Sequence, residues 1–470
     1  MRCQICTGCG LCPGVIAERD GRGLRILGGE ESEAITDMPG TVTCPEGYRL
    51  IAADIGTTTI AMELYGKEGK VADRYVTVNP QVEFGRDVIS RIQAAADPEK
   101  KKKLQDDVKS ALSMGGKRFL KCLKAGEQPL MVIAANTTMS YLLMGWDCEE
   151  LGEAPFTARK LSGAQFFLKL EEGRIPCLLL PGISAFVGGD IYAGICACGM
   201  HEKRERTLLV DLGTNGEIAL GSREGILCTA TAAGPAFEGG PNRGIWGADL
   251  VRYTAMLLEE GILDGTGLLR EPYFQTGIRI GNVEITQESV RSLQLAKAAI
   301  AAGAEILIKE AGITPDQIGQ VVLAGGFGYY LHPEDAVKIG MLPEQFLGRT
   351  VSGGNTALLG VKRIGLELLQ NAANHVGSEL LQNAANHVGP ELLQNAVSHS
   401  GREKGERTEV SHAGREKGTQ TELEKKLQGS IDAALQADRG GLLKALPKVR
   451  TINLAQHPDF SAAYLNAMEL

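Results

Sequence analysis

The sequence has no excess of positive charge and no long uninterrupted apolar run. Lysine and arginine total 49 against 57 aspartate and glutamate residues, which gives a formal net charge of -8. General nucleic-acid binding needs a basic surface, so this balance argues against a nucleic-acid partner. The longest apolar stretch, residues 175–200, contains two prolines, a Gly-Gly pair and Asp190. Because such breakers and a carboxylate are costly in lipid, we interpret it as a buried strand, turn and helix and expect no membrane association.

Aromatic residues are scarce, at 5%, and no signal peptide is recognisable at the start of the sequence. With 470 residues, 43% of them hydrophobic, the chain can form two or three domains with a large core. The 60 glycines suit many tight turns and hinges. Eleven cysteines without a leader indicate a reducing compartment, where clustered thiols are more often metal ligands than disulfides. We therefore predict a cytoplasmic protein.

Five cysteines gather near the N-terminus. Cys3, Cys6, Cys9 and Cys12 follow each other at three-residue intervals, and Cys44 precedes a proline. This spacing brings successive sulfurs to one side of a small cluster, and the interleaved glycines allow tight loops, so we predict an iron-sulfur cluster of the 4Fe-4S type. Four ligands suffice, so either Cys44 or one of the other four is spare. A structural zinc site and free thiols remain the alternatives.

Two glycine-threonine turns each follow a short apolar strand. They are Asp54-Ile55-Gly56-Thr57-Thr58-Thr59 and Asp211-Leu212-Gly213-Thr214-Asn215-Gly216-Glu217. Glycine lets backbone N-H groups approach an anion, threonine hydroxyls add donors, and an aspartate at a strand end can hold hydrated magnesium. Two such turns predict that one clamps the inner phosphates of ATP while the other orients metal and water at the outer phosphate.

The remaining chain alternates between strand and helix patterns. We predict strands at Ile60–Tyr65, at residues 129–135 and at Gln320–Ala324, and helices at Glu99–Lys124 and Ser289–Ala311. The last strand runs into Gly325-Gly326-Phe327-Gly328, a turn that would allow close approach of an adenosine. An ordinary strand-helix turn without a ligand is the alternative for this segment alone.

In this order the motifs resemble the superfamily of sugar and acetate kinases, chaperone ATPases and actin, over roughly Leu50 to Lys362. Longer motifs resemble one branch, the ATP-dependent reductive activators of corrinoid proteins. These motifs are NPQVEFGRDVISRI at residues 79–92, AANTTMSYLLMG at 134–145, LVDLGTNGEIAL at 209–220, ATAAGPAFEGG at 230–240, VLAGGFGYYL at 322–331 and GNTALLG at 354–360. The resemblance implies an α/β, two-lobed actin-like ATPase fold made of duplicated ribonuclease-H-like domains.

The resemblance also implies an enzyme, an ATP hydrolase coupled to electron transfer. It would pass a low-potential electron from its iron-sulfur cluster to the cobalt(II) of a corrinoid protein, with ATP and Mg as cofactors and a separate ferredoxin as donor. The best-known activators carry a whole 2Fe-2S ferredoxin domain before the ATPase, whereas this chain has only about 48 residues there. The acceptor is therefore left open to another metalloprotein, such as a dehydratase, and a homodimer is compatible with the pattern.

Site residues are carried over by motif. The catalytic set is Asp54, Asp211 and Glu217, the last of which would orient the attacking water or bind metal through water. The residues expected to bind nucleotide are Gly56, Thr57, Thr58, Thr59, Gly213, Thr214, Asn215, Gly234, Pro235, Gly325, Gly326, Phe327 and Asn355. A nucleotide-gated redox sensor that docks a partner without delivering electrons is the second hypothesis. A kinase of a small metabolite is a weaker third, because it has no use for five N-terminal thiols.

Three further features complete the predictions. Asn79, Gln81 and Asp87 in the branch motif would either face a partner or simply cap a helix. The six later cysteines are expected to be small core residues: Cys122, Cys148, Cys177, Cys196, Cys198 and Cys228. ELLQNA recurs every twelve residues from Glu367, and SHSGREKGERTEV is followed by a near copy, which indicates tandem duplication into short, interrupted helical turns. The histidines of these repeats do not by themselves predict a metal site.

The expected domains are therefore five. They are a cysteine-rich module at residues 1–48, a first ATPase lobe at 49–200, a second lobe at 201–364, a flexible repeat insertion at 365–446, and a closing strand and helix at 447–470.

Overall fold

The computed structural model describes residues 43–171, 173–213, 215–234, 236, 247–281, 283–387 and 449–470. Of the predicted site, Cys3, Cys6, Cys9, Cys12, Thr214 and Pro235 lie outside the described residues, as does most of the repeat region. The chain divides into two units, Met1–Gly365 with Leu446–Leu470, and Leu366–Ala445. Both six-stranded sheets and the two-stranded sheet belong to the first unit.

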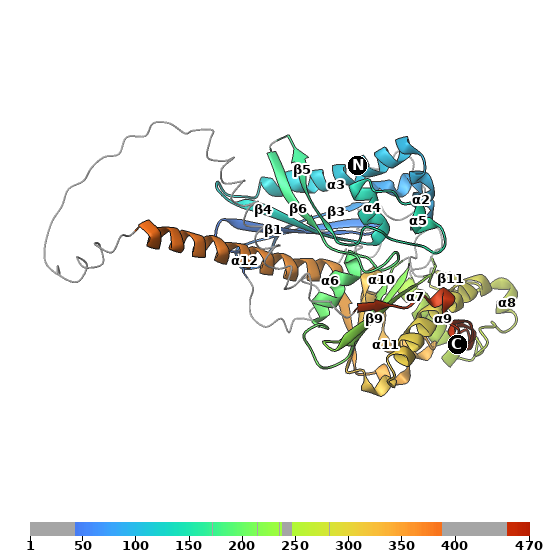
Figure 1. The fold of residues 1–470 in the computed structure, drawn as a ribbon. Helices are drawn as coiled ribbons and strands as arrows, with labels where there is room; N and C mark the ends of the chain where they lie inside the picture. The colour runs from blue at the N-terminus through green and yellow to red at the C-terminus, as the bar shows by residue number, and fades with distance from the viewer. Residues whose placement is uncertain are drawn as a thin grey trace. The chain divides into compact units, whose positions relative to one another are not determined.

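The first lobe is built on a six-stranded sheet in the order β3-β2-β1-β4-β6-β5 (Figure 1). Its strands are β1 Tyr48–Ile55, β2 Thr59–Tyr65, β3 Val71–Val78, β4 Gln128–Ala135, β5 Ala164–Leu170 and β6 Gly173–Leu179. Strand β1 pairs antiparallel with β2 and parallel with β4, and its residues from Arg49 to Ala53 are buried. A central strand covered on both faces needs such a continuous apolar run.

Most helices of the first lobe begin at side-chain caps. The helices are η3 Pro80–Phe84, α2 Val88–Ala95, α3 Pro98–Leu120, α4 Thr137–Met144, α5 Glu149–Gly152 and α6 Gly189–Cys198. Of these, α5 and α6 begin without such a cap. Asp87, Asp97 and Asn136 each accept a hydrogen bond from a first-turn N-H of the helix that follows. These caps satisfy donors that have no partner inside the helix, so the sequence sets where the helices start.

The second lobe repeats the topology of the first. Its sheet has the order β13-β12-β7-β8-β9-β14. The strands are β7 Thr207–Leu212, β8 Gly216–Ser222, β9 Gly225–Thr231, β12 Gln320–Ala324, β13 Thr350–Gly354 and β14 Val449–Thr451. The run β9-β8-β7-β12-β13 matches β3-β2-β1-β4-β6, with an antiparallel meander followed by two parallel strands in each case. The predicted duplicated α/β fold is confirmed.

Further helices and a small hairpin complete the described chain from β9 onward. They are α7 Gly247–Glu259, α8 Tyr273–Thr276, β10 Ile278–Ile280, β11 Val283–Ile285, α9 Gln287–Glu310, η4 Pro315–Gln317, α10 Gly325–Tyr330, α11 Pro333–Lys338, η5 Glu344–Phe346, α12 Thr356–His387, η8 Leu454–Gln456 and α14 Phe460–Asn466. Helix α9 packs on β8 and β9, and Leu293, Ile300 and Leu307 of its apolar face are buried in the lobe's core. Thr286 and Ser289 form a capping box at its start.

Helices α6 and α12 cross at two glycines. A Cβ atom on Gly360 would lie 1.9 Å from the carbonyl oxygen of Ala193, and one on Gly194 would lie 3.1 Å from Oγ1 of Thr356. The two backbones therefore touch, which places the start of α12 beside α6 of the other lobe. This crossing positions the residues at both helix starts.

Two predictions about local structure are wrong. Helix α12 continues through the first two ELLQNA repeats to His387, because a single glycine in a helix interior costs only about 1 kcal/mol relative to alanine. Cys122 is exposed, because it follows the end of α3, with its Sγ near the carboxylate of Asp73. The other five late cysteines are buried, as expected.

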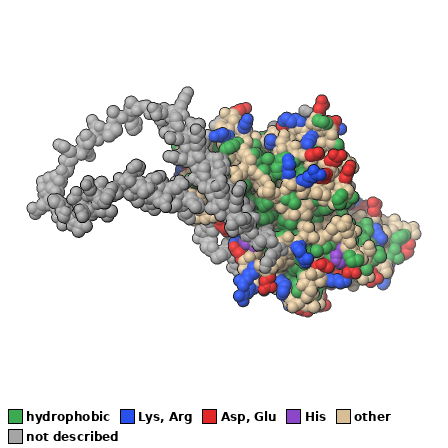
Figure 2. Space-filling model, in the orientation of Figure 1, with side chains coloured by type: hydrophobic (Ala, Val, Ile, Leu, Met, Phe, Trp, Pro, Cys, Tyr) green, Lys and Arg blue, Asp and Glu red, His purple; other side chains and the backbone are tan. Residues whose placement is uncertain are grey.

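The surface is mixed in character. Figure 2 shows apolar side chains interspersed with acidic and basic ones on the face that it displays. Within the described ranges, no helix is both long enough and apolar enough to cross a membrane.

Candidate functional site

The first glycine-threonine turn joins β1 to β2. Asp54 is the last residue but one of β1 and lies opposite Ala61 of β2 and Ala134 of β4. The N-H of Gly56 donates to the carbonyl of Thr59 at 2.9 Å, which closes the turn. Asn136, which caps α4, donates from Nδ2 to Oγ1 of Thr57 at 3.1 Å. The turn, the end of β4 and the start of α4 thus meet at one edge of the sheet.

The second turn occupies the equivalent place between β7 and β8. Asp211 is the last residue but one of β7, opposite Glu217 of β8 and Ala324 of β12. The N-H of Gly213 donates to the carbonyl of Asn215 at 3.0 Å. Asp54 and Asp211 are therefore structural equivalents, whereas Ala61 stands where the second lobe has Glu217. This asymmetry places an extra carboxylate in the second lobe only.

Gly325, at the end of β12, must be glycine. Its φ is +81°, and a Cβ there would lie 2.6 Å from both Oδ1 of Asp211 and the carbonyl oxygen of Leu212. A side chain would push against the Asp211 carboxylate itself, since only glycine adopts this backbone without strain. Gly326 is exposed with open space around its Cβ position, while Phe327 is buried in the core of the lobe. Of the predicted nucleoside frame, Gly325 therefore borders the Asp211 carboxylate, Gly326 is open to solvent, and Phe327 packs in the core beneath the turn.

Asp190 at the start of α6 joins these carboxylates, and sequence reasoning missed it. Its charge raises the pKa of Asp54, of Asp211 and of Glu217, so it lies near all three. A signal was available in the topology, because α6 follows β6 in the first lobe as α12 follows β13 in the second. Asp190 in α6 and Asn355 just before α12 are therefore near-equivalent positions at two helix starts.

Asn355 links the second lobe to the first turn. Its Nδ2 donates to Oδ2 of Asp54 at 2.9 Å, and its Oδ1 accepts from the N-H of Leu358 at 2.8 Å. The side chain thus caps α12 and holds Asp54 at the same time. The second lobe thus contacts Asp54 through Asn355, and the first lobe places the charge of Asp190 near Asp211.

The four carboxyl groups resist ionisation. Burial raises the pKa of Asp211 to about 8, and the charges of Asp190 and Asp54 add to this effect. Burial likewise raises the pKa of Asp54 to about 7 and of Asp190 to about 6, and the pKa of Glu217 lies well above its usual value. In the part of the chain that the structure describes, none of the groups that perturb them is a lysine or arginine. Acidic groups gathered without a basic partner form a site suited to a cation.

The carboxylates do not form a ready chelate. Among the residues that the structure describes, no three His, Cys, Asp or Glu side chains are close enough together to hold a metal ion alone. Magnesium commonly keeps several of its waters and binds through one or two carboxylates plus phosphate oxygens. The arrangement therefore fits a hydrated magnesium ion brought in with a nucleotide.

Cys44 is the single member of the N-terminal cysteine set within the described residues. It is buried, its N-H donates to the carbonyl of Lys67 at 3.0 Å, and its Sγ lies 3.9 Å from the carbonyl oxygen of Tyr65. Burial raises the pKa of the thiol. Its sulfur therefore lies against the start of the ATPase lobe, beside the end of β2.

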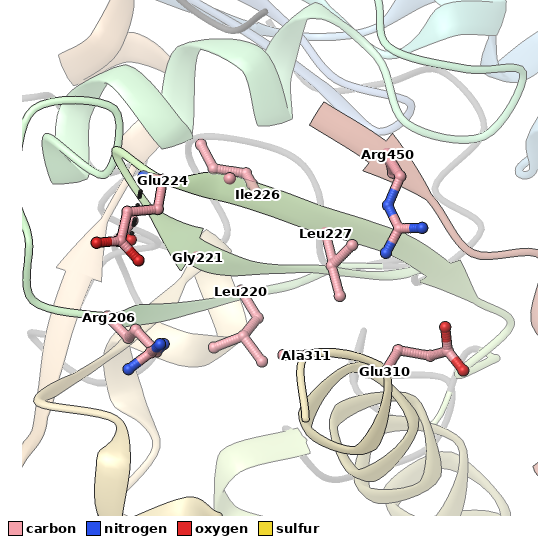
Figure 3. A pocket seen from close by; sticks show the side chains of 11 residues that line it. Arg206, Leu220, Gly221, Glu224, Ile226, Leu227, Glu310, Ala311 and Arg450 are labelled. Atoms are coloured by element: carbon pink, nitrogen blue, oxygen red, sulfur yellow. Dashed lines mark hydrogen bonds between the residues drawn. The ribbon is translucent and has the colours of Figure 1, made fainter. Parts of the chain in front are cut away.

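A separate cavity of about 520 Å³ lies at the opposite end of the second sheet (Figure 3). Leu220 and Leu227 contribute an apolar lining, and Arg206, Glu224, Glu310 and Arg450 surround it. Its strand residues come from the end of β8, the start of β9 and β14, whereas Asp211 and Glu217 lie near the end of β7 and the start of β8. The cavity is not part of the carboxylate site.

Comparison with known families agrees with this geometry. The family model described as the RACo middle region matches residues 50–203. The model described as the C-terminal domain of RACo, the ASKHA domain, matches residues 205–243 and 241–386. The chain belongs to the RACo family. The resemblance seen in the motifs is confirmed at the level of the family.

Two curated proteins resemble this RACo-family chain. The corrinoid activation enzyme RamQ of Eubacterium limosum is 30% identical over 360 residues, which cover 63% of this chain and 60% of RamQ. The [Co(II) methylated amine-specific corrinoid protein] reductase of Methanosarcina barkeri is 24% identical over 267 residues, which cover 45% of this chain and 47% of the reductase. The chain thus spans less than two thirds of either relative.

Among solved structures, a reductive activator for a corrinoid, iron-sulfur protein superposes with a TM-score of 0.64. It is 24% identical, and the match covers 90% of this chain and 66% of that structure. At this identity the likeness establishes the fold, which is the ASKHA fold found in actin-like ATPases.

Proposed function

We propose that this chain is an ATP hydrolase that reductively activates a corrinoid protein. The observation that carries the proposal is the pair of equivalent turns with half-buried carboxylates that no basic side chain among the described residues neutralises. The names of the two curated relatives support the choice of acceptor, because both act on corrinoid proteins.

The carboxylates would hold magnesium and the attacking water. Asp54 and Asp211, at matching strand ends, would bind the hydrated ion that accompanies ATP. Glu217, which has no counterpart in the first lobe, would orient water at the outer phosphate or bind the metal through water. A bound divalent cation favours ionised carboxylates, so it would offset the cost of burying these groups together.

The turns would hold the phosphates through backbone N-H groups, since glycine and short polar residues leave the backbone accessible. The first turn carries the hydroxyls of Thr57, Thr58 and Thr59, and the second contributes Asn215 together with Thr214. Asn355 would couple nucleotide binding in the first lobe to the start of α12, because its side chain both contacts Asp54 and caps α12. A change at Asp54 would thus alter how α12 begins.

The electron would come through the N-terminal segment. An iron-sulfur cluster held by four of Cys3, Cys6, Cys9, Cys12 and Cys44 would supply a one-electron carrier, loaded by a ferredoxin-type donor. Transfer to the acceptor reduces its cobalt(II) to cobalt(I). An uphill one-electron step loses about tenfold in equilibrium for every ~59 mV, and ATP-dependent binding of the acceptor can offset this.

Anaerobic reconstitution tests the proposal. The protein is purified without oxygen, assayed for iron and sulfide, and mixed with titanium(III) citrate and the cobalt(II) form of a methylamine corrinoid protein. We expect the cobalt(I) absorption band to grow only when MgATP is added. Growth without ATP, or no ATP hydrolysis under any condition, would contradict the assignment.

A matched pair of variants separates the site from general effects. Asp211→Asn removes a site carboxylate, and we expect it to abolish ATP-dependent reduction while leaving the iron and sulfide content unchanged. Asp73→Asn alters a carboxylate that pairs with Arg118 in the first lobe, with 2.7 Å between Nε of Arg118 and Oδ2 of Asp73. This control should reduce the acceptor at the rate of the unmodified protein.

A further inference from the structure

The segment from Asn79 to Arg91 holds the carbonyl groups of the three residues between β1 and β2, which are Gly56, Thr57 and Thr58. Nδ2 of Asn79 donates to the carbonyl of Gly56 at 2.8 Å, and the N-H of Asn79 donates to the carbonyl of Thr58 at 2.9 Å. The remaining carbonyl, that of Thr57, accepts from Nη2 of Arg91 at 2.6 Å. The segment therefore lies directly behind the turn, on its carbonyl side.

Fixing these carbonyls also fixes the direction of the N-H groups. In a trans peptide, C=O and N-H point in opposite directions within one plane. The carbonyls of Gly56 and Thr57 share their peptide planes with the N-H groups of Thr57 and Thr58. Neither of these two N-H groups donates a hydrogen bond within the described part of the chain. Both are therefore aimed away from the segment and remain available to an anion.

The segment is itself rigidly supported. Asn79 and Gln81 are fully buried, and Nε2 of Gln81 donates to the carbonyl of Leu104 in α3 at 2.8 Å. Nε of Arg91 donates to the carbonyl of Gly85 at 3.0 Å, where φ is +144° and a Cβ would lie 2.2 Å from the Cβ of Ser90. A side chain at Gly85 would therefore displace α2, which carries Arg91.

Arg91 places a buried positive charge behind the turn. Its side chain is fully buried, and no ion pair joins it to a carboxylate among the described residues. Burial lowers the pKa of the guanidinium to about 10, and it stays protonated at neutral pH. The charge of Asp87 favours the protonated guanidinium, but the larger effect of burial still lowers its pKa. Burying this cation is therefore costly in folding, and an anion on the far side of the turn would recover part of that cost.

We propose that Asn79 and Arg91 are positioning residues that aim the N-H groups of Thr57 and Thr58 at the phosphates of ATP. This deepens the proposed function and rests on it. It also replaces the alternative that Asn79 and Gln81 face a partner protein, because both side chains are buried. Asp87 caps α2 through the N-H of Ser90 at 2.8 Å.

Hydrogen exchange on the unmodified, full-length protein gives the first test. MgATP should slow the exchange of the amides of Thr57 and Thr58, read by mass spectrometry on overlapping peptides, more than it slows those in β3. If the protein binds MgATP without this protection, the positioning inference is overturned while the proposed function stands. If it binds no MgATP at all, the proposed function fails as well.

Variants give the second test, read as affinity for MgATP and for adenosine. Arg91→Met should weaken MgATP binding about 10- to 100-fold, because hydrogen bonds from a charged donor are among the stronger ones. Arg91→Lys keeps the charge but cannot span two carbonyls, so it should lose most of the same affinity. Asn79→Asp keeps the size of the side chain but removes the Nδ2 donor to the carbonyl of Gly56. It should weaken MgATP binding as the Arg91 variants do. Adenosine, which has no phosphate, should bind all variants equally.

Lys297→Met is the matched control, because Lys297 is a fully buried cation of the second lobe whose Nζ donates to the carbonyl of Glu469. It should leave MgATP affinity unchanged. Equal weakening of MgATP and adenosine in the Arg91 and Asn79 variants would show general distortion and overturn the proposal. Affinity of Arg91→Lys equal to that of the unmodified protein would also overturn it, because the charge alone would then account for binding.

Discussion

Replacing Asp211 by asparagine should stabilise the ligand-free protein while removing its response to nucleotide. Burial and the charges of Asp190 and Asp54 raise the pKa of Asp211 from 3.8 to about 8. The folded state therefore keeps a proton that the unfolded chain has already released in this range. Each pH unit between the two values lowers the free energy of unfolding by at most ~1.4 kcal/mol.

The measured effect should be smaller than this limit. Asp211 is half-buried, so water can stabilise part of its ionised form. We expect Asp211→Asn to be about 2 kcal/mol more stable than the unmodified protein at pH 8, which corresponds to roughly 4–8 °C in melting temperature if a lobe of about 150–250 residues unfolds as one unit. The difference should shrink as the pH falls and vanish near 3.8, where the aspartate is protonated in both states.

Differential scanning calorimetry from pH 4.5 to 8.5, with EDTA and then with MgATP, measures both effects. A ligand present at 100 times its dissociation constant stabilises the folded state by about 2.7 kcal/mol, and we expect this gain only in the unmodified protein. Asp73→Asn is the control with opposite sign, because the hydrogen bond from Arg118 lowers the pKa of Asp73. That variant should lose under ~1 kcal/mol at neutral pH and keep its MgATP response. Equal stability of Asp211→Asn and the unmodified protein at every pH would refute the reasoning, as would an undiminished MgATP response.

Three other substitutions test separate parts of the structure. Glu217→Gln should slow steady-state ATP hydrolysis at least ~100-fold with little change in the dissociation constant for MgATP, and a parallel loss of binding would count against a role in orienting water. Gly360→Ala should lower the free energy of unfolding by about 3 kcal/mol in chemical denaturation, because its Cβ would lie 1.9 Å from a backbone carbonyl. Gly66→Ala, whose Cβ would lie at an ordinary 3.6 Å, is its control, and equal effects would contradict the close helix crossing. Burial lowers the pKa of Lys297 from 10.5 to about 8, so the unfolding free energy should rise with pH between these values, and Lys297→Met should lack that rise.

The two glycine-threonine turns could be predicted from sequence because their determinants are local. A strand, a glycine and short polar residues follow each other within a few positions, and β1, β2, β7 and β8 form where the pattern indicates. The long helices α3 and α9 were predicted to within a few residues for the same reason, since periodicity and caps act over one or two turns. The ends of helices were less predictable, as Cys122 shows.

Residues that depend on distant contacts escaped sequence reasoning. Asp190 was noticed only as a charge that interrupts an apolar run, and its place among the carboxylates depends on α6 crossing α12. Asn79 and Arg91 lie in a recognisable motif, yet their task is visible only from the carbonyls that they hold more than twenty residues away. A hydrogen bond between positions far apart in the chain leaves no periodic trace in the sequence.

The sequence by itself determined the local turns, the caps, the repeated strand-helix order and hence the duplicated fold. Tertiary structure alone decided which polar groups from the two lobes lie together, because that depends on the close crossing of α6 and α12, where Gly360 meets Ala193 and Gly194 meets Thr356. It also decided which side of the first turn faces outward, because peptide planarity converts three anchored carbonyls into two directed N-H donors.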